Sequence, residues 1–198
     1  MHPRLGHGFL FCLKVIMKIL IVSDSHGMNG PLRAAIMKEA PDMLIHLGDS
    51  EYSTDEIAKW AGSPKNPCVF VRGNCDASYF MSSGVRDEAV FELKGHKIFC
   101  CHGHRQRVNF GLLTLSLTAQ EQGCDIVLFG HTHVPYDSFG DALTDYSRIY
   151  ESRGDYPTGP RILNPGSISL PRGGSSRGYM IMDIEDDGRY DVRYVSAT

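Results

Sequence analysis

The fold is decided by residues 17–27, which read MKILIVSDSHG. The β-rich apolar run Ile19–Val22 predicts a buried strand, and polar residues follow it directly. After a short turn, Pro31 stands in the first turn of a predicted helix that runs to about Ala40. A strand, a turn and a helix in this order are typical of the opening of a βαβ unit.

The same alternation of apolar runs and helical patterns continues along the chain and favours an α/β fold over an all-α or all-β fold. Ser53 and Glu56 form a capping-box pattern for a helix that ends near Gly62. The other predicted elements are strands at Met43–Leu47, Val69–Val71 and Ile126–Phe129, a helix at Phe110–Gln122, and hairpins pairing Glu88–Leu93 with Lys97–Cys101 and Gly178–Ile184 with Tyr190–Val195.

The composition suits one compact soluble domain. The chain has 198 residues, of which 42% are hydrophobic, enough for a sizeable core. Twenty Lys and Arg against 23 Asp and Glu give a formal charge of -3, so strong nucleic-acid binding is not expected. The early apolar stretch Gly8–Ile16 is too short for a membrane-spanning helix, which needs roughly 20 residues. Six cysteines without paired spacing favour reduced thiols and a cytoplasmic location.

Two stretches fall outside the regular pattern. Residues 1–16 are either an extra strand or tail, or the product of a start codon upstream of Met17, so the predicted single domain spans 17–198. Residues 136–160 are polar, carry Gly, Pro, Asp and Ser, and predict a long loop or insertion. Loops of that length serve as lids or binding elements or are disordered. Because its ends lie near His133 and Asn164, we expect a lid, a substrate wall or an oligomer contact.

Polar clusters follow five of the predicted strands. In α/β sheets the carboxyl ends of strands share one edge, where ligands bind, so the clusters can converge on one site. Taken singly, an Asp or Asn after a strand more often caps a turn or a helix. The clusters are Ser23–His26, Gly48–Asp49, Gly73–Asp76, His102–His104 and Gly130–His133.

The residue types in these clusters suit a divalent metal. Imidazole and carboxylate in similar numbers, with Cys75 as the one thiol, match Mn, Fe, Co, Ni or Zn, with Mn preferred here. Two metals a few ångströms apart need about seven ligands, one of them bridging, and the clusters supply that number.

The motifs D-x-H, G-D, G-N-C-D, H-G-H and G-H-T-H occur in this order, and with residues 71–76, 130–135 and 164–174 they resemble the calcineurin-like metallophosphoesterase superfamily. Within it they are similar to the small bacterial YfcE-type phosphodiesterases, over residues 17–196. The resemblance implies a four-layer sandwich of two mixed β-sheets flanked by helices. It also implies a hydroxide nucleophile between two metals, the first held by Asp24, His26 and His133, the second by Asn74, His102 and His131, with Asp49 bridging.

The chain departs from the superfamily pattern at two positions. Many members have His where Cys75 stands, and that His helps to protonate the leaving group or binds the phosphate. His104 and Cys75 are the candidate catalytic residues here; with Cys75 in place of His, help for the leaving group comes from His104, from solvent or from no group. Many members also have Asp where Tyr52 stands, which puts the orientation of the first-site histidines in doubt.

Three further residues are candidate substrate contacts. Arg72 and Arg172 lie beside the motifs and have the donor geometry to grip a phosphate, although either can equally be a surface charge. Ser167 can line the site or cap a turn.

The sequence therefore predicts a cytoplasmic hydrolase that cleaves small phosphodiesters with two metal ions, and it leaves a homo-oligomer open. The rival hypotheses are a noncatalytic interaction or scaffold module on the same fold, and a protein that binds a single metal ion.

Overall fold

The computed structural model describes residues 16–139 and 159–197. Its described strands are β1 (Ile16–Val22), β2 (Met43–His46), β3 (Cys68–Phe70), β4 (Glu88–Leu93), β5 (His96–Cys101), β6 (Ile126–Leu128), β7 (Pro135–Phe139), β8 (Arg161–Pro165), β9 (Gly178–Glu185) and β10 (Tyr190–Ser196). Its described helices are α1 (Asn29–Glu39), α2 (Thr54–Trp60) and α3 (Leu113–Glu121), with short 3₁₀ turns at Ser78–Phe80 (η1) and Val108–Phe110 (η2).

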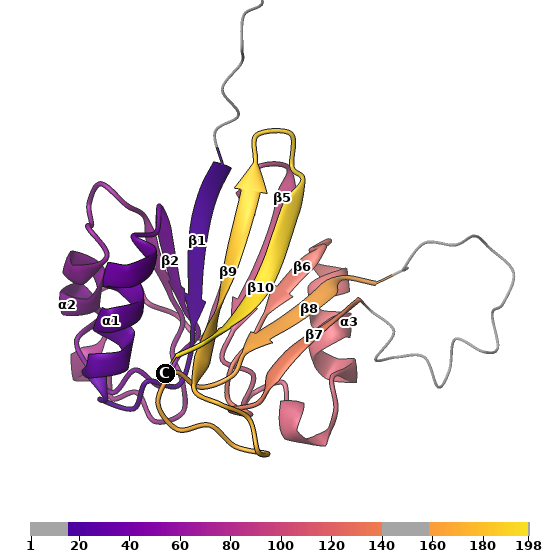
Figure 1. The fold of residues 1–198 in the computed structure, drawn as a ribbon. Helices are drawn as coiled ribbons and strands as arrows, with labels where there is room; N and C mark the ends of the chain where they lie inside the picture. Colours follow the sequence, from indigo (N-terminus) through magenta and orange to yellow (C-terminus); the bar gives the residue numbers. More distant parts are fainter. Residues whose placement is uncertain (1–15, 140–158, 198) are drawn as a thin grey trace, which may run out of the picture.

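The strands form two five-stranded mixed sheets that pack against each other (Figure 1). The first sheet has the order β10-β9-β1-β2-β3, with β1, β2 and β3 parallel and β9 antiparallel to β1. The second has the order β4-β5-β6-β8-β7, in which β5, β6 and β8 are parallel and the edge strands are antiparallel. The predicted sandwich of two mixed sheets is confirmed.

Alternating side chains of β1 divide the core into layers. Ile19 and Ile21 point toward the second sheet, where they join a cluster that includes Ile98 of β5. Leu20 and Val22 point the other way and pack against α1 and α2. A third cluster, formed by buried residues of α3, β5, β6 and β8, covers the outer face of the second sheet. The order of layers is therefore helix, sheet, sheet, helix.

The helix boundaries follow the local signals closely. Ser53 caps α2 by accepting a hydrogen bond from the backbone N–H of Glu56 at 3.4 Å, as the capping-box pattern predicts. α3 begins three residues later than predicted, because the chain first makes η2 and then turns at Gly111, where φ is +126°. The predicted strand after Gly123 is confirmed as β6.

The predicted loop at 136–160 is wrong at its start. Residues 135–139 form β7, which pairs antiparallel with β8. Pro135 occupies the first position of this edge strand, where its missing N–H costs no ladder hydrogen bond. The sequence of β7 has no alternation of apolar and polar residues that would predict a strand, and the strand is defined by its hydrogen bonds to β8. Residues 140–158, and residues 1–15 of the predicted extension, lie outside the described residues; Ile16 opens β1.

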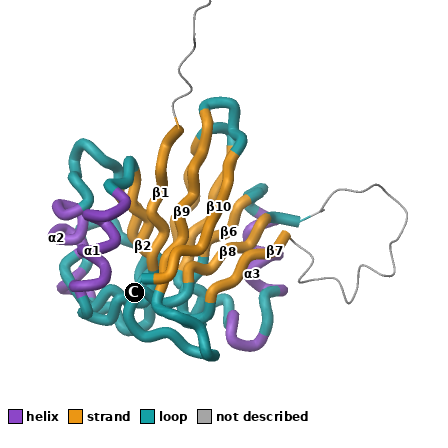
Figure 2. The backbone as a smooth tube through the Cα atoms, in the orientation of Figure 1, coloured by secondary structure: helices purple, strands orange, loops and turns teal. Residues whose placement is uncertain are grey.

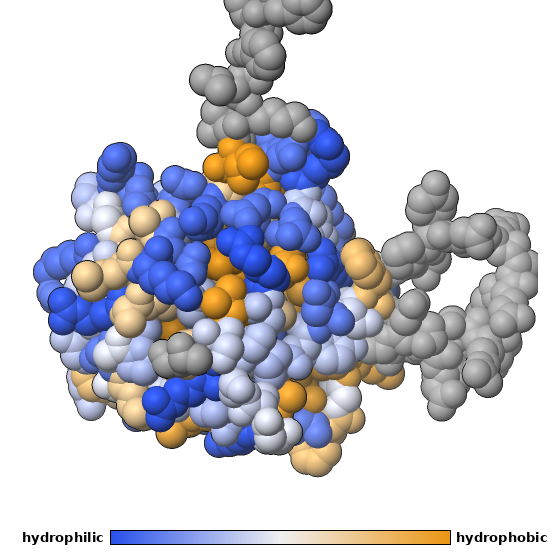
Figure 3. Space-filling view, viewed as in Figure 1, coloured by the Kyte–Doolittle hydropathy of each residue, from blue (hydrophilic) through white to orange (hydrophobic). Residues whose placement is uncertain are grey.

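Loops gather at one end of both sheets, the end where the parallel strands finish (Figure 2). On the face shown in Figure 3, apolar side chains are scattered among hydrophilic ones. In the described part of the chain no helix combines the length and apolar character needed to cross a bilayer. The five cysteines of that part are all free thiols.

Candidate metal centre

The loops after β1, β2, β5 and β6 are joined to one another by backbone hydrogen bonds. The N–H of Asp24 donates to the carbonyl of Gly48 at 3.0 Å, and the N–H of His26 donates to the carbonyl of Asp49 at 3.0 Å. The N–H of Gly130 donates to the carbonyl of His102 at 3.0 Å. Segments that lie far apart in sequence therefore meet at one edge, as the clusters predict.

The side chains of these loops form a compact cluster of carboxylates and imidazoles. Asp24 Oδ1 lies 3.1 Å from His133 Nε2 and 3.9 Å from both His26 Nε2 and His102 Nε2. Asp49 Oδ2 lies 3.3 Å from His102 Nε2 and 4.0 Å from His26 Nε2. Five of the seven predicted ligands therefore surround one small volume.

The backbone at these ligands is in a conformation that side chains normally avoid. Asp24, His26, Asp49, His131 and His133 all have positive φ, between 45° and 70°. Each such residue costs about 1–2 kcal/mol relative to the right-handed region. Non-glycine residues held in this way cluster at functional sites, and here the conformation turns several side chains toward one point.

Three glycines leave room for the ligands. A Cβ on Gly73 would lie 2.0 Å from Asp49 Oδ1, and one on Gly130 would lie 2.0 Å from Ser23 Oγ. At Gly48 a Cβ would lie 2.7 Å from His102 Nδ1. A side chain at these positions would displace the ligand loops, so these glycines are part of the site.

Three histidines are held through Nδ1 and present Nε2 to the cluster. His102 Nδ1 lies 2.7 Å from the carbonyl oxygen of Leu47, and His133 Nδ1 lies 2.5 Å from that of Leu170. His26 Nδ1 lies 2.6 Å from Glu51 Oε1. With Nδ1 donating, Nε2 is left with the lone pair that a metal ion requires.

The electrostatics of the site favour ionised carboxylates. Burial alone would raise the pKa of Asp24, but the neighbouring His133 and His102 imidazoles lower it below its usual value. Burial opposes ionisation of Asp49 too, and the His102 imidazole again lowers the pKa. Burial favours a lower pKa for His102, yet Asp49 and Asp24 raise it. Buried negative charge thus attracts a cation.

Among the buried side-chain atoms without a hydrogen-bonding partner are Asp24 Oδ1 and His102 Nε2. Both belong to the cluster, and an unpaired polar atom in the interior is costly unless something binds it. Three overlapping groups have ligand atoms within 4.8 Å of one another: Asp24, His26 and His133; Asp24, Asp49 and His102; and His26, Asp49 and Cys75. The donor set therefore fits a divalent metal.

The other two predicted ligands lie beside the cluster. His131 Nε2 is 3.0 Å from the side-chain amide of Asn109, and its ring centroid is 5.1 Å from that of His102. The amide of Asn74, an exposed side chain, donates to Cys75 Sγ at 3.2 Å. Neither side chain makes a contact with the carboxylates of Asp24 or Asp49.

The candidate proton donors are both close to the cluster. Burial, with the charge of Asp49, raises the pKa of the Cys75 thiol to about 12. The ring centroid of His104 lies 5.4 Å from that of His102, and its Nδ1 is buried without a partner. Burial and the charge of His102 lower the pKa of His104.

Of the two roles predicted for Ser167, the structure shows the turn cap, because its hydroxyl accepts from the backbone N–H groups of Ser169 and Leu170. Its hydroxyl is fully buried, donates to the backbone carbonyl of Asp24 at 2.7 Å and accepts from the N–H of Leu170 at 2.7 Å. It supports the Asp24 loop from behind. Burial favours a lower pKa for His133, but Asp24 raises it above its usual value, and the charge of the exposed Arg172 only partly opposes that rise. Arg72 is half-buried with an unpaired Nε.

Sequence reasoning missed two residues that support the site. Glu51 contacts His26, and Asp76 accepts hydrogen bonds from the loop that carries Asp49. Asp76 lies inside a recognised cluster, but nothing in the sequence distinguishes it from a ligand. Glu51 lies two residues after the G-D motif, and its side chain is directed at His26 by a left-handed backbone turn that the sequence does not reveal.

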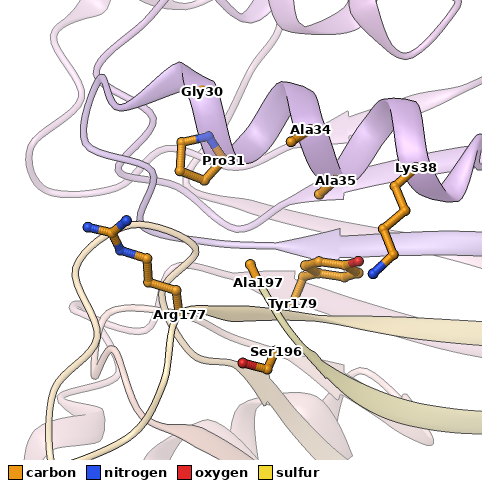
Figure 4. A pocket seen from close by; sticks show the side chains of 9 residues that line it. All are labelled: Gly30, Pro31, Ala34, Ala35, Lys38, Arg177, Tyr179, Ser196 and Ala197. Atoms are coloured by element: carbon orange, nitrogen blue, oxygen red, sulfur yellow. The ribbon is translucent and has the colours of Figure 1, made fainter.

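One cavity lies away from the metal cluster. It has a volume of about 380 Å³ and lies between α1 and the end of β10, with Lys38, Arg177 and Tyr179 in its wall (Figure 4). It contains none of the predicted metal ligands. The donor atoms that could bind a metal ion lie in the Asp and His cluster and not in this cavity.

Comparison with known proteins agrees with this chemistry. The family model for the calcineurin-like phosphoesterase superfamily domain matches residues 17–187. The chain belongs to this superfamily. It is 32% identical to "Probable metallophosphoesterase YsnB" of Bacillus subtilis over 173 residues, covering 86% of each chain. It is 25% identical to "Phosphodiesterase YfcE" of Escherichia coli over 189 residues, covering 85% of this chain and 88% of that one.

A solved structure confirms the fold. A conserved protein from Streptococcus pneumoniae, described as a predicted phosphoesterase, superposes with a TM-score of 0.69 at 29% identity. The match covers 92% of this chain and 91% of that chain. The protein is therefore a member of a metal-dependent phosphoric ester hydrolase family, and its Asp and His residues form a group that could bind metal.

Proposed function

We propose that the protein is a phosphodiesterase with two divalent metal ions, bridged by Asp49. The observation that carries the proposal is the position of Asp49 Oδ2, within 4.0 Å of His26 Nε2 and 3.3 Å of His102 Nε2. Asp49 thus belongs to ligand groups that contain a histidine of either predicted site. A carboxylate between two such groups is suited to bridge two ions.

The first ion would be held by Asp24, His26 and His133. The second would be held by His102 together with Asn74 and His131. Asn74 is exposed and His131 is partly exposed, and both side chains would turn toward the cluster to hold this ion, His131 by giving up its contact with the Asn109 amide. Imidazole with carboxylate suits Mn, our preferred metal, and also Fe, Co, Ni or Zn. When bound, such ions lower the pKa of a water nucleophile and neutralise phosphate charge.

The chain's own residues define the rest of the reaction. Arg72 and Arg172 would contact the phosphate, since the charge of Arg172 reaches His133 and Arg72 directly precedes the loop that carries Asn74. His104 or Cys75 would donate a proton to the leaving group. An imidazole is a better proton donor near neutral pH than a thiol, so His104 is the stronger candidate.

The preference for diesters rests on the YfcE relative, whose name specifies that activity.

We further propose that residues 17–198 form a single domain. A cytoplasmic location would suit the free thiols. The segment after β7 would serve as a lid, a substrate wall or an oligomer contact. The substrate would be a small phosphodiester.

The test is an assay of purified protein against phosphodiesters and phosphomonoesters, each with Mn²⁺, Co²⁺, Ni²⁺, Zn²⁺ or Fe²⁺. We expect turnover of diesters, highest with one of these metals, and much weaker turnover of monoesters. Preference for monoesters would overturn the diester assignment. Metal binding without any turnover would instead favour a scaffold module on the same fold.

A further inference from the structure

His26 differs from the other clustered histidines in the partner of its Nδ1. His102 and His133 are held by backbone carbonyls, whereas His26 is held by the carboxylate of Glu51 at 2.6 Å. A carboxylate is a stronger acceptor than a carbonyl, and it raises the basicity of the opposite nitrogen. Glu51 therefore occupies the place of a partner that orients a metal-binding histidine.

Glu51 is itself held in place by a second carboxylate. Its φ is 46°, and its backbone N–H donates to Asp76 Oδ1 at 2.9 Å. Asp76 Oδ1 also accepts from Ser50 Oγ at 3.0 Å. Without these bonds the left-handed turn at Glu51 would relax and carry its side chain away from His26.

The other oxygen of Asp76 supports the predicted bridging ligand. Asp76 Oδ2 accepts from the backbone N–H groups of Asp49 and Gly73, both at 2.8 Å. Asp76 is only 9% exposed, so its carboxylate is committed to these four hydrogen bonds and not to solvent. One buried side chain thus joins the loop after β2 to the loop after β3.

We propose that Glu51 and Asp76 are positioning residues of the metal centre: Glu51 sets the tautomer of His26, and Asp76 holds Glu51 and Asp49 in their left-handed turn. The inference rests on the proposed function insofar as it assigns metal binding to His26 and Asp49. It resolves the doubt raised by Tyr52, because Glu51 one position earlier provides the acidic partner.

The first test compares Glu51→Ala and Glu51→Gln with a matched control. Mn²⁺ affinity is measured by calorimetry, and the His26 tautomer is read from imidazole ¹⁵N shifts of the metal-free protein at about pH 8. Glu51→Ala should lower affinity by roughly 10- to 100-fold and mix the tautomers. Glu51→Gln keeps an acceptor oxygen, so it should retain the Nδ1–H tautomer with a smaller loss of affinity.

The control is Glu56→Gln, because the Glu56 side chain is 44% exposed and forms an ion pair with Lys59 on α2. It should change neither the affinity nor the tautomer. Wild-type affinity together with an unmixed tautomer in Glu51→Ala would overturn the role of Glu51. The tautomer readout needs no metal and no substrate, so a wild-type protein that fails to hydrolyse diesters leaves this test decisive.

The second test concerns Asp76. Asp76→Asn places an NH₂ group against backbone donors, so we expect Mn²⁺ affinity to fall about tenfold or more and the His26 tautomers to mix. A merely structural role would lower the melting temperature while leaving the tautomer unchanged. Ser50→Ala removes one of the four hydrogen bonds and carries the test if Asp76→Asn does not fold, with a loss of a few-fold expected. Unchanged affinity and tautomer in the folded variant would overturn the role of Asp76.

Discussion

The two ends of the sandwich use the same pair of groups for different purposes. At the metal end, His26 contacts Glu51 through Nδ1 and keeps Nε2 directed at the ligand cluster. At the hairpin end, His96 contacts Asp125 through Nδ1 at 2.5 Å and the carbonyl of Gly188 through Nε2 at 2.7 Å. Both nitrogens of His96 are occupied, so this pair serves stability alone.

The two ends also differ in where the backbone adopts positive φ. At the hairpin end, positive φ occurs at Lys94 and Gly95, where a two-residue turn between antiparallel strands requires it. At the metal end, positive φ occurs at ligands such as Asp24 and Asp49, where strand connection alone does not demand it. The contacts at the hairpin end therefore stabilise the fold, whereas the strained backbone at the metal end is destabilising and orients the ligand side chains.

The largest effect is expected for Asp49→Asn, which removes the proposed bridging charge. Diester hydrolysis should fall by roughly 10²-fold or more, because the two ions can no longer share a carboxylate. The melting temperature of the metal-free protein should change little. Ile21→Ala is the comparison variant: it lies in the core and should cost about 2–5 kcal/mol in unfolding free energy while the folded protein still binds metal. Equal destabilisation by both variants would show that Asp49 contributes to stability as a core residue does.

Gly73→Ala should also abolish metal binding, but through sterics. The added Cβ would lie 2.0 Å from Asp49 Oδ1 and 2.3 Å from its backbone nitrogen, so the loop must move. Calorimetry should show loss of tight Mn²⁺ binding. Gly30→Ala in α1 is the matched control, since its Cβ meets nothing within 4 Å; it should bind metal normally. Normal Mn²⁺ binding by Gly73→Ala would show that the close packing at Asp49 is dispensable.

Cys75→His should change substrate preference at the metal end. A nitrophenolate leaves without a proton, whereas an alkoxide gains from a general acid, so turnover of alkyl diesters should rise about tenfold more than that of an aryl diester. Rates are compared at equal metal occupancy, because Cys75 lies within the cluster. An equal response of both substrate classes would assign proton transfer to His104 or to none.

The smallest effect is expected at the hairpin end. Burial favours a lower pKa for His96, but the hydrogen bonds to Asp125 and Gly188 raise it above its usual value. The pair therefore contributes stability below about pH 6.5, and that contribution is lost as the pH rises through the raised pKa. Asp125→Asn should remove this dependence, at a cost under about 1 kcal/mol because the carboxylate is half exposed. Urea unfolding across pH measures it, and metal affinity should not change; an unaltered pH profile would refute the assignment.

Much of the fold is predictable because its signals are local. The capping box at Ser53 and the apolar run Ile19–Val22 depend on neighbouring residues, and both are confirmed: Ser53 caps α2, and the run is buried in β1. β7 is not predictable in this way, because a long-range pairing with β8 defines it. The role of Glu51 is not predictable for a related reason: it depends on a backbone turn and on a contact with the distant His26 loop, which no spacing in the sequence encodes.

The central claim is that one cluster binds two metal ions through Asp49. Its most direct test is elemental analysis of the protein after Mn²⁺ loading and gel filtration, with Asp49→Asn treated in parallel. The account predicts close to two ions per chain for the wild-type protein and a clear reduction for the variant. A reproducible value of one ion per chain, or the same value for both proteins, would contradict it.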